Sequence, residues 1–264
     1  MLPYLVDFGF IKIPTYGVMI ASAYIVSYYY LLKRARDYKI NEKEVSDIVF
    51  YTIVFGFIGA KIFYIITFFN YFGTNFKTRI INTFSLDNIR AGFVFYGGFI
   101  FATVFVYLYS KKKKLDFLKI GDFLAPAIAL AHSIGRIGCF SAGCCHGAPT
   151  QSIFGVRFTN PMCDVSPELI GVKIHPTQLY ESVGNFAIFL ILNYVSKKNT
   201  QRNGFVLFLY FMSYSILRFI VEFFRGDDRG SKILGFSQAQ FISIIVFLIS
   251  IYFIFKYGKE KNNI

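Results

Sequence analysis

Long apolar runs separated by short polar connections recur along the whole chain. Seven stretches are predominantly apolar over about 18 residues or more: residues 15–32, 47–69, 93–110, 117–137, 178–195, 204–224 and 237–255. A helix of that length reaches about 27 Å, which is enough to cross the hydrocarbon core of a bilayer. The pattern therefore predicts an all-α, polytopic membrane protein with about seven transmembrane helices. We expect a single transmembrane domain over residues 1–264.

The fourth stretch is the least apolar of the seven. It contains Lys119, Asp122, Pro126 and His132. Polar and ionisable side chains are costly in lipid, so a helix that carries them normally turns them toward other helices or a polar cavity. We expect the fourth helix to lie inside the helix bundle.

The positive charge is concentrated in four connections. The chain carries a formal net charge of +13, and more than half of its 28 lysines and arginines fall in residues 33–45, 110–119, 197–203 and 256–264. Positively charged connections stay on the cytoplasmic side of a membrane. We therefore expect the N-terminus outside and the C-terminus in the cytoplasm. Scattered topogenic charges explain the basic excess, and without a long soluble segment to carry a basic surface we expect no nucleic-acid partner.

The overall composition excludes two broad classes of protein. Only 16% of the residues are charged, against about 25% in an ordinary soluble domain. A content of 20% aromatic residues is incompatible with a disordered chain. The longest segment outside the apolar runs, about residues 136–176, is rich in Gly, Pro and Cys, and long loops in compact proteins commonly carry function. We expect an outward functional loop there.

Ionisable residues inside two apolar runs indicate a buried polar site. Lys61 lies in the second run, and Arg218 and Glu222 lie in the sixth. At 100° per residue, Tyr214, Arg218, Glu222 and Arg225 share one helical face within about 80°. The alternative is that Arg218 and Glu222 only neutralise each other as an i, i+4 pair.

A polar string opens the fifth run, with His175, Gln178, Tyr180 and Glu181 around Pro176. Proline is tolerated in the first helical turn, and an acidic residue near a helix N-terminus is favoured by the helix dipole. Helix-start chemistry alone would explain the string. The string alone therefore does not show whether these residues have a function.

A glycine-rich segment with one arginine follows the fourth run. Gly135 and Gly138 flank Arg136, whose guanidinium offers five donors in a fork that matches phosphate. Glycine permits close backbone approach to a ligand. The segment is therefore a candidate clamp for a phospholipid headgroup.

All four cysteines, Cys139, Cys144, Cys145 and Cys163, lie within 25 residues. A disulfide between Cys163 and Cys144 or Cys145 would suit an oxidising exterior. A metal site with His146 is an alternative, although paired Cys-x-x-Cys spacings are absent. Apolar packing or one reactive thiolate are further alternatives. The spacing does not decide among them.

These strings together resemble the prolipoprotein diacylglyceryl transferase family of bacterial inner-membrane enzymes. The resemblance covers nearly the whole chain, in strings at residues 16–17, 59–61, 96–98, 122–126, 135–138, 175–181 and 218–225. It implies seven spans in the bacterial cytoplasmic (inner) membrane. It also implies transfer of a diacylglyceryl group from phosphatidylglycerol to the lipobox cysteine of a prolipoprotein signal sequence, forming a thioether. We expect no cofactor and no metal.

The resemblance also implies roles for individual residues. Arg136 matches the arginine that holds the headgroup, and Arg218 matches an essential arginine; with Tyr96 they are the catalytic candidates. The substrate-binding candidates are Arg136, Tyr16, Lys61, Gly97, Gly98, His175, Gln178, Tyr180, Glu181, Tyr214, Glu222 and Arg225.

Three positions depart from the family pattern. Tyr96 stands where the family usually has a histidine, Cys139 where it has an asparagine, and Cys144 where it has a glutamate. The proton acceptor is therefore open among Tyr96, His132 and His146.

The expected chemistry agrees with the candidate residues. Displacing a phosphate ester from carbon requires a thiolate and cationic groups that stabilise the leaving oxygens, and Arg136 and Arg218 supply such groups. Two other functions remain open. One is a membrane thiol-redox protein that uses the four cysteines, and the other is a non-catalytic lipid-binding relative.

Overall fold

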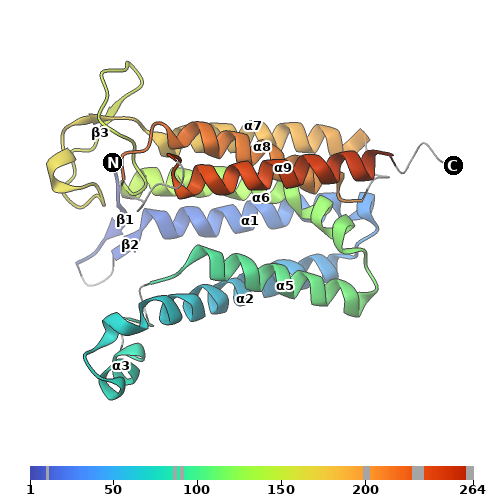
Figure 1. Cartoon of the computed structure of the whole chain (residues 1–264), viewed down its shortest axis with the longest axis horizontal. Helices are drawn as coiled ribbons and strands as arrows, with labels where there is room; N and C mark the ends of the chain where they lie inside the picture. The colour runs from blue at the N-terminus through green and yellow to red at the C-terminus, as the bar shows by residue number, and fades with distance from the viewer. Residues whose placement is uncertain (10–11, 86–87, 90–91, 199–202, 228–234, 260–264) are drawn as a thin grey trace. The chain divides into compact units, whose positions relative to one another are not determined.

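Each of the seven predicted apolar runs forms a long helix in the computed structural model of the chain (Figure 1), which describes residues 1–9, 12–85, 88–89, 92–198, 203–227 and 235–259. The helices are α1 (Thr15–Tyr38), α2 (Glu42–Phe68), α5 (Phe95–Lys113), α6 (Phe117–Ala142), α7 (Thr177–Lys198), α8 (Phe205–Glu222) and α9 (Gln238–Lys259). The all-α prediction is therefore confirmed at the level of the main elements.

Several short elements were not predicted. They are β1 (Tyr4–Asp7), β2 (Lys12–Pro14), η1 (Phe69–Phe72), α3 (Phe76–Thr83), β3 (Val156–Arg157), η2 (Pro167–Leu169) and β4 (Lys173–Ile174). β1 pairs antiparallel with β2, and β3 pairs antiparallel with β4. The four strands, of two to four residues each, are too short to give a period-2 pattern, which is why the sequence does not reveal them.

Four of the long helical segments are apolar and long enough to cross a membrane by length and composition. They are Glu42–Phe72, Phe117–Ala142, Phe205–Glu222 and Gln238–Lys256. The chain is therefore a multi-pass membrane protein. Helices α1, α5 and α7 carry more polar residues and fall outside this group, so seven crossings and the side on which each terminus lies stay predictions.

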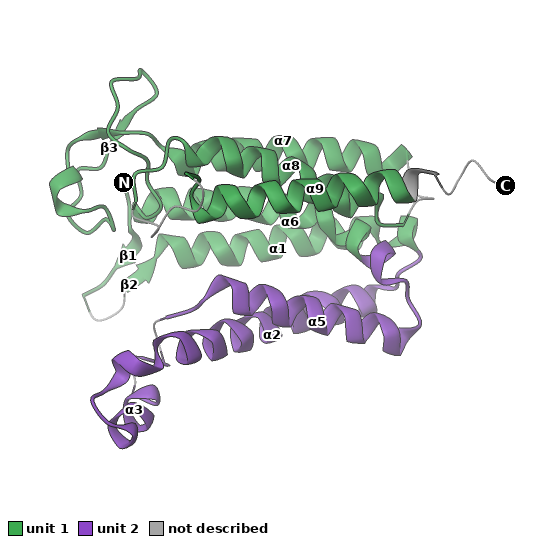
Figure 2. Cartoon of the chain, in the orientation of Figure 1, with its two compact units in different colours: residues 1–38, 121–264 green, residues 39–120 purple. Residues whose placement is uncertain are grey.

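The chain divides into two compact units, residues 1–38 with 121–264 and residues 39–120 (Figure 2). In the second unit α2 packs against α5. A Cβ atom on Gly59 would stand 2.5 Å from the carbonyl oxygen of Gly97, so the two backbones touch there. Small residues allow such close helix crossings in membranes. The single domain over residues 1–264 stays a prediction.

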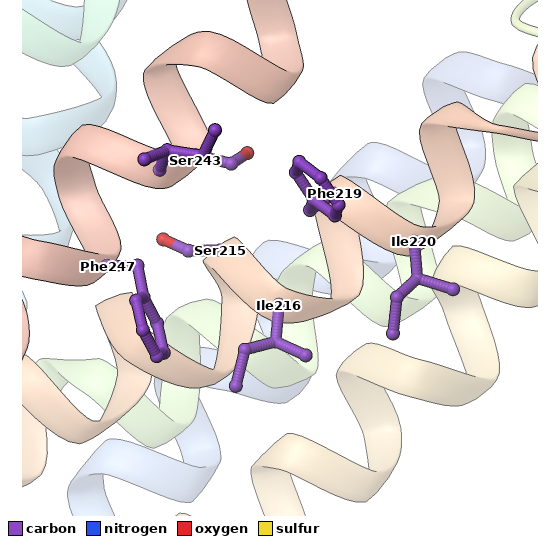
Figure 3. A pocket seen from close by; sticks show the side chains of 7 residues that line it. Ser215, Ile216, Phe219, Ile220, Ser243 and Phe247 are labelled. Carbon is purple, nitrogen blue, oxygen red and sulfur yellow. The ribbon is translucent and has the colours of Figure 1, made fainter. Parts of the chain in front are cut away.

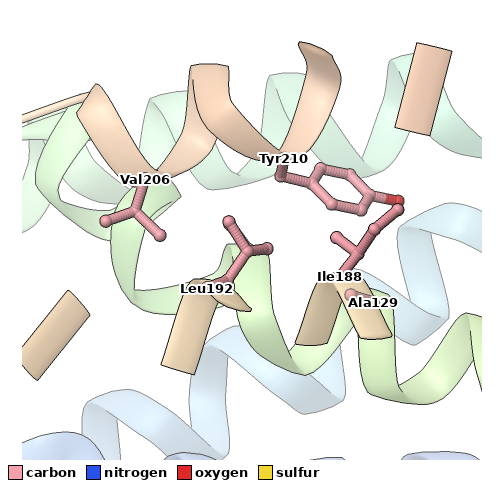
Figure 4. Close-up of a cluster of buried hydrophobic side chains, with 6 residues drawn as sticks. Ala129, Ile188, Leu192, Val206 and Tyr210 are labelled. Atoms are coloured by element: carbon pink, nitrogen blue, oxygen red, sulfur yellow. The ribbon is translucent and has the colours of Figure 1, made fainter. Parts of the chain in front are cut away.

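The first unit contains α1, α6, α7, α8 and α9 side by side (Figure 1). A core of buried apolar side chains joins α6, α7 and α8 (Figure 4): Ala125, Ala129, Ile188, Leu192, Val206 and Tyr210. Helix α8 also packs on α9. This core holds the helix ends that carry the candidate site.

Asp122 of α6 caps the N-terminus of α8. Its two carboxylate oxygens accept hydrogen bonds from the backbone N–H groups of Gly204 and Leu207, each at 2.7 Å. A helix N-terminus favours a carboxylate, because its first N–H groups have no partner within the helix. The N-terminus of a neighbouring helix thus stabilises the charge of Asp122, as expected for a helix inside the bundle.

The segment from 143 to 176 is a folded loop with its own apolar core. Phe158, Cys163, Val165 and Ile174 are buried together. The loop lies at the end of the first unit where α7 begins and α8 ends (Figure 1). Its backbone pairs with the residues after α8 through a bridge between Gly147 and Arg225. Three helix ends therefore meet under the loop.

Candidate active site

Glu181 lies at the centre of a buried cluster of charges. It stands in the second turn of α7 and has an exposed fraction of 0%. Arg218 of α8 donates from Nη1 to Glu181 Oε1 at 2.8 Å, and Arg136 Nη2 of α6 lies 2.6 Å from Oε2. Guanidinium groups from two helices thus converge on one carboxylate from a third, because α6 and α8 end where α7 begins.

Arg218 is shared between two carboxylates. Its Nη2 also donates to Glu222 Oε2 at 2.5 Å, and Glu222 Oε1 accepts from Ser237 Oγ at 2.8 Å. The i, i+4 pair considered from the sequence is present, and the pair also belongs to the larger site. Both Nη atoms of Arg218 are therefore occupied by protein carboxylates.

Arg225 enters the cluster just beyond the end of α8. Its Nε and Nη2 donate to the two carboxylate oxygens of Asp227 at 2.8 and 2.6 Å. Its Nη1 lies 3.7 Å from Glu181 Oε1. A bidentate pair of this kind holds the guanidinium in a fixed plane.

These contacts define the arginine–carboxylate cluster, which consists of Arg136, Arg218, Arg225, Glu181, Glu222 and Asp227. Its three guanidinium groups and three carboxylates balance in charge. Two buried donors, Arg136 Nε and Arg225 Nη1, have no hydrogen-bond acceptor among the described residues. Buried donors without acceptors are costly and commonly mark the place of a ligand. Here they suit the oxygens of an anion.

His132 and Tyr214 line the cluster. His132 Nε2 lies 3.8 Å from Glu181 Oε2, and the His132 and Tyr214 rings are 5.1 Å apart between centroids. The sequence offered His132 only as one of three proton acceptors. Asp227 and Ser237 were missed, because nothing in their local sequence distinguishes them from other polar loop residues.

Three predicted substrate-binding residues anchor the loop to α7. Gln178 Nε2 donates to the Cys144 carbonyl at 2.8 Å, and His175 Nδ1 lies 3.1 Å from the Tyr180 hydroxyl. The His175 backbone N–H and carbonyl pair with the segment after Cys145. These contacts hold the loop in place, and the proposed contacts of these residues with substrate stay predictions.

Tyr16 lies at the start of α1, close to the end of α6. A Cβ atom on Gly138 would stand 3.3 Å from the Tyr16 ring, so the absence of a side chain at Gly138 lets the two helices approach. Tyr16 is 43% exposed. Its proposed role toward substrate stays a prediction.

The four cysteines are free thiols, so the disulfide considered from the sequence is not formed. Cys163 lies in the loop core. The Sγ atoms of Cys139, Cys144 and Cys145 lie within 4.8 Å of one another. Hydrogen bonds from the thiols of Cys139 and Cys144 lower the pKa of Cys145. The nearby guanidinium charges of the arginine–carboxylate cluster act in the same direction.

Two apolar grooves flank α8. One, of about 230 Å³, lies between α8 and α9 (Figure 3) and is lined by Ser215, Ile216, Phe219, Ile220, Ser243, Ile244 and Phe247. The other, of about 360 Å³, is lined by Ser152, Phe154, His175, Tyr180, Leu217, Ile220, Val221 and Phe224. The second groove adjoins the helix turns that carry Arg218 and Glu222.

The remaining candidates belong to residues 39–120. Lys61 Nζ donates to the backbone carbonyls of Asn88 and Gly92 and lies 4.8 Å from the centroid of the Tyr64 ring. Gly97 is part of the close contact between α2 and α5, and Tyr96 is 57% exposed. Gly98 packs against Gly56. The catalytic or binding roles of Lys61, Tyr96, Gly97 and Gly98 stay predictions.

Comparison with known proteins identifies the family of the chain. The model of the family described as prolipoprotein diacylglyceryl transferase matches residues 3–256. Proteins named phosphatidylglycerol--prolipoprotein diacylglyceryl transferase are similar to this chain: that of Clostridium tetani is 39% identical over 96% of both chains. The second such protein of Clostridium perfringens is 38% identical over 90% of this chain and 88% of its own. That of Clostridioides difficile is 35% identical over 96% of this chain and 95% of its own. This chain belongs to the prolipoprotein diacylglyceryl transferase family.

Proposed function

We propose that the chain transfers the diacylglyceryl group of phosphatidylglycerol to the lipobox cysteine thiol of a prolipoprotein, forming a thioether. The observation that carries the proposal is the convergence of Arg136 and Arg218, from two helices, on the buried Glu181. The names of the relatives, which span nearly the whole chain, support the same substrates.

The headgroup phosphate binds where the cluster has unused donors. Arg136 Nε and Arg225 Nη1 are buried and lack an acceptor among the described residues, whereas both Nη atoms of Arg218 already contact carboxylates. Arg136 and Arg225 therefore contact the phosphate directly, and Arg218 holds Glu181 and Glu222 in place. This division differs from the sequence-based hypothesis, in which Arg136 and Arg218 formed the clamp.

The acyl chains lie along apolar surface beside the cluster. The groove lined by Leu217, Ile220 and Val221 shares the α8 turns that carry Arg218 and Glu222. A lipid needs an anionic site and an apolar site side by side, and this end of α8 offers both.

The transfer step is a displacement at carbon. The acceptor thiolate attacks the carbon of the diacylated glycerol that bears the phosphate ester. A C–S bond forms there, and the bond from this carbon to the phosphate oxygen breaks. Glycerol phosphate leaves with the electron pair, and fixed guanidinium groups stabilise its developing charge. The thiol proton passes to a nearby base, for which His132 beside Glu181 has the favourable position. Tyr96 and His146 are the other two candidates from the sequence.

We further propose seven crossings of the bacterial cytoplasmic (inner) membrane, with the N-terminus outside and the C-terminus in the cytoplasm. The concentration of lysine and arginine in four connections supports this orientation. It places the loop at 143–176 and the arginine–carboxylate cluster toward the outer face. The acceptor signal sequence would approach from that side.

The test is thioether formation by the purified chain in vesicles that contain phosphatidylglycerol. A lipobox peptide with its cysteine is incubated with the vesicles, and the mass of the product is measured. Arg136→Gln and Arg225→Gln are expected to lower the rate by about 10²–10³-fold each. Arg157→Gln is the matched control and should retain the rate, because Arg157 is exposed in the loop and its Nη1 donates to the Gly171 carbonyl.

The product separates the proposal from its two rivals. A peptide whose cysteine is replaced by serine should gain no lipid. Bound phosphatidylglycerol without thioether would identify a lipid-binding protein. Oxidation or reduction of the peptide without lipid transfer would identify a thiol-redox protein. Full transfer activity in both arginine variants would refute the assigned site.

A further inference from the structure

Three thiols gather beside the arginine–carboxylate cluster, and the proposed function does not use them. Cys139 lies in the last turn of α6, and Cys144 and Cys145 follow directly after the helix. Their Sγ atoms lie within 4.8 Å of one another. Three thiols converge here although the chain has only four cysteines, and the fourth, Cys163, lies in the loop core.

The backbone that carries these thiols is held in an unusual conformation. Cys145 has a φ of +63°, in the left-handed region that a non-glycine residue rarely adopts. Thr177 Oγ1 donates to the Cys145 carbonyl at 2.9 Å, and Gln178 Nε2 donates to the Cys144 carbonyl at 2.8 Å. Two buried side chains of α7 thus fix the two carbonyls. Strained backbone that is fixed in this way is typical of functional sites.

The spacing of the sulfur atoms fits a metal ion. Thiolates bind Zn²⁺ at about 2.3 Å, which places neighbouring sulfur atoms about 3.8 Å apart in a tetrahedral site. The observed separations need a contraction of at most about 1 Å, within reach of χ1 adjustments. Arg136 Nη1 lies 4.0 Å from Cys139 Sγ, so a fixed positive charge lies beside the three sulfur atoms.

We propose that Cys139, Cys144 and Cys145 bind one thiophilic metal ion, for which Zn²⁺ is the probe, and leave a fourth coordination position open. From the sequence we expected no metal, and the alternative left open was a site that also used His146; the proposed site uses the three cysteines alone. Sites with three protein ligands and one open position are those that accept a substrate atom. The acceptor thiol would take the open position as a thiolate, with its proton passed to the nearby base of the proposed function. This last role rests on the proposed function.

The site is placed to serve the transfer reaction. Arg136 contacts the three-cysteine group on one side and Glu181 on the other. A thiolate bound to the metal would therefore lie next to the arginine that we assign to the phosphate. Coordination would favour loss of the thiol proton to the base of the proposed function.

The first test measures the metal itself in the full chain, purified with a reductant. We expect about one Zn²⁺ per chain by elemental analysis. Co²⁺ added after chelation should give the charge-transfer absorption of cobalt–thiolate bonds. Cys139→Ser, Cys144→Ser and Cys145→Ser should each weaken Co²⁺ binding by at least about tenfold. Cys163→Ser is the matched control and should leave Co²⁺ binding unchanged.

Three results would overturn the metal site. They are a chain without bound metal and without the cobalt–thiolate absorption, an absorption that persists in the triple serine variant, and a disulfide between two of the three cysteines in the freshly purified protein. A folded control is available for each variant, because circular dichroism reports helix content independently of metal.

The second test asks about the open position and uses no phosphatidylglycerol, so no transfer occurs. A lipobox peptide with cysteine should shift the Co²⁺ absorption, and the serine peptide should not. An identical spectrum with both peptides would overturn the role of the open position. Thioether formation by a metal-free chain would refute the metal role and leave the proposed function intact. A metal-loaded chain that makes no thioether would refute the proposed function and leave the metal site intact.

Discussion

Glu181 sets the charge balance of the whole site. Its carboxylate is fully buried and lies between Arg218 Nη1 and Arg136 Nη2. A buried charge is tolerated when opposite charges and hydrogen bonds surround it, and removal of one partner leaves the others uncompensated. The effect of Glu181 on activity is therefore inseparable from its effect on stability.

Glu181→Gln is expected to destabilise the protein by about 3–5 kcal/mol. The amide keeps the shape of the side chain, but two guanidinium groups then face each other without the anion between them. The measurement is the free energy of unfolding in detergent, together with the rate of thioether formation.

Glu168→Gln is the matched control, because Glu168 is exposed in η2 and should change stability by less than about 0.5 kcal/mol. An equal effect of the two substitutions would mean that Glu181 is not the centre of the cluster.

At the scale of elements, helix ends and helix crossings decide how the site is held. The N-terminus of α8 depends on Asp122 of α6, which accepts from two backbone N–H groups at 2.7 Å. Helix α8 carries Arg218, so the cap on one end of this helix supports the site near its other end. The pairing of α2 with α5 depends on Gly59 and Gly97, where the two helix backbones touch.

Asp122→Ala should destabilise the protein by about 1–2 kcal/mol, because the first turn of α8 loses its cap. Asp122→Asn retains an acceptor oxygen and should cost less. Thermal unfolding of the purified variants measures both. Asp37→Ala is the control at an exposed position of α1, and a drop in melting temperature as large as that of Asp122→Ala would contradict the capping role.

Gly97→Ala should destabilise the pairing of α2 with α5. A Cβ atom there would overlap the carbonyl oxygen of Gly59 and the side chain of Phe63, and backbone cannot move aside without opening the crossing. Gly17→Ala is the matched control, since a Cβ atom on Gly17 meets nothing within 4 Å.

Reduced binding of phosphatidylglycerol by Gly97→Ala, with an unchanged melting temperature, would instead favour the substrate-binding role that the sequence suggested for Gly97. The two readouts therefore separate packing from binding at this position.

At the scale of the whole molecule, membrane orientation decides which substrate can reach the site. We expect seven crossings with the C-terminus in the cytoplasm, because the basic connections favour that side. Green fluorescent protein should fluoresce when fused after Lys113 or Lys256. Alkaline phosphatase, which folds outside the cytoplasm, should be active after Ser152. Phosphatase activity after Lys113, or its absence after Ser152, would contradict the orientation.

Local patterns could be predicted because they depend on one segment at a time. An apolar run long enough to cross lipid must become a helix, since every backbone polar group needs a partner inside the membrane. The 100° spacing likewise placed Arg218 and Glu222 on one face, and they do pair. The seven helices and the polar face of α8 could therefore be predicted from the sequence.

Contacts between distant segments were decided only by the tertiary structure. Glu181 looked like a helix-start residue, and the structure makes it the partner of arginines from α6 and α8. From the sequence Asp122 was only an acidic residue within an apolar run. In the structure it caps α8, which begins more than 80 residues later. Charge pairing and thiol proximity depend on three-dimensional distance, which helical periodicity along one segment does not contain. The sequence determined which residues could do chemistry, and the packing of helix ends determined which of them meet.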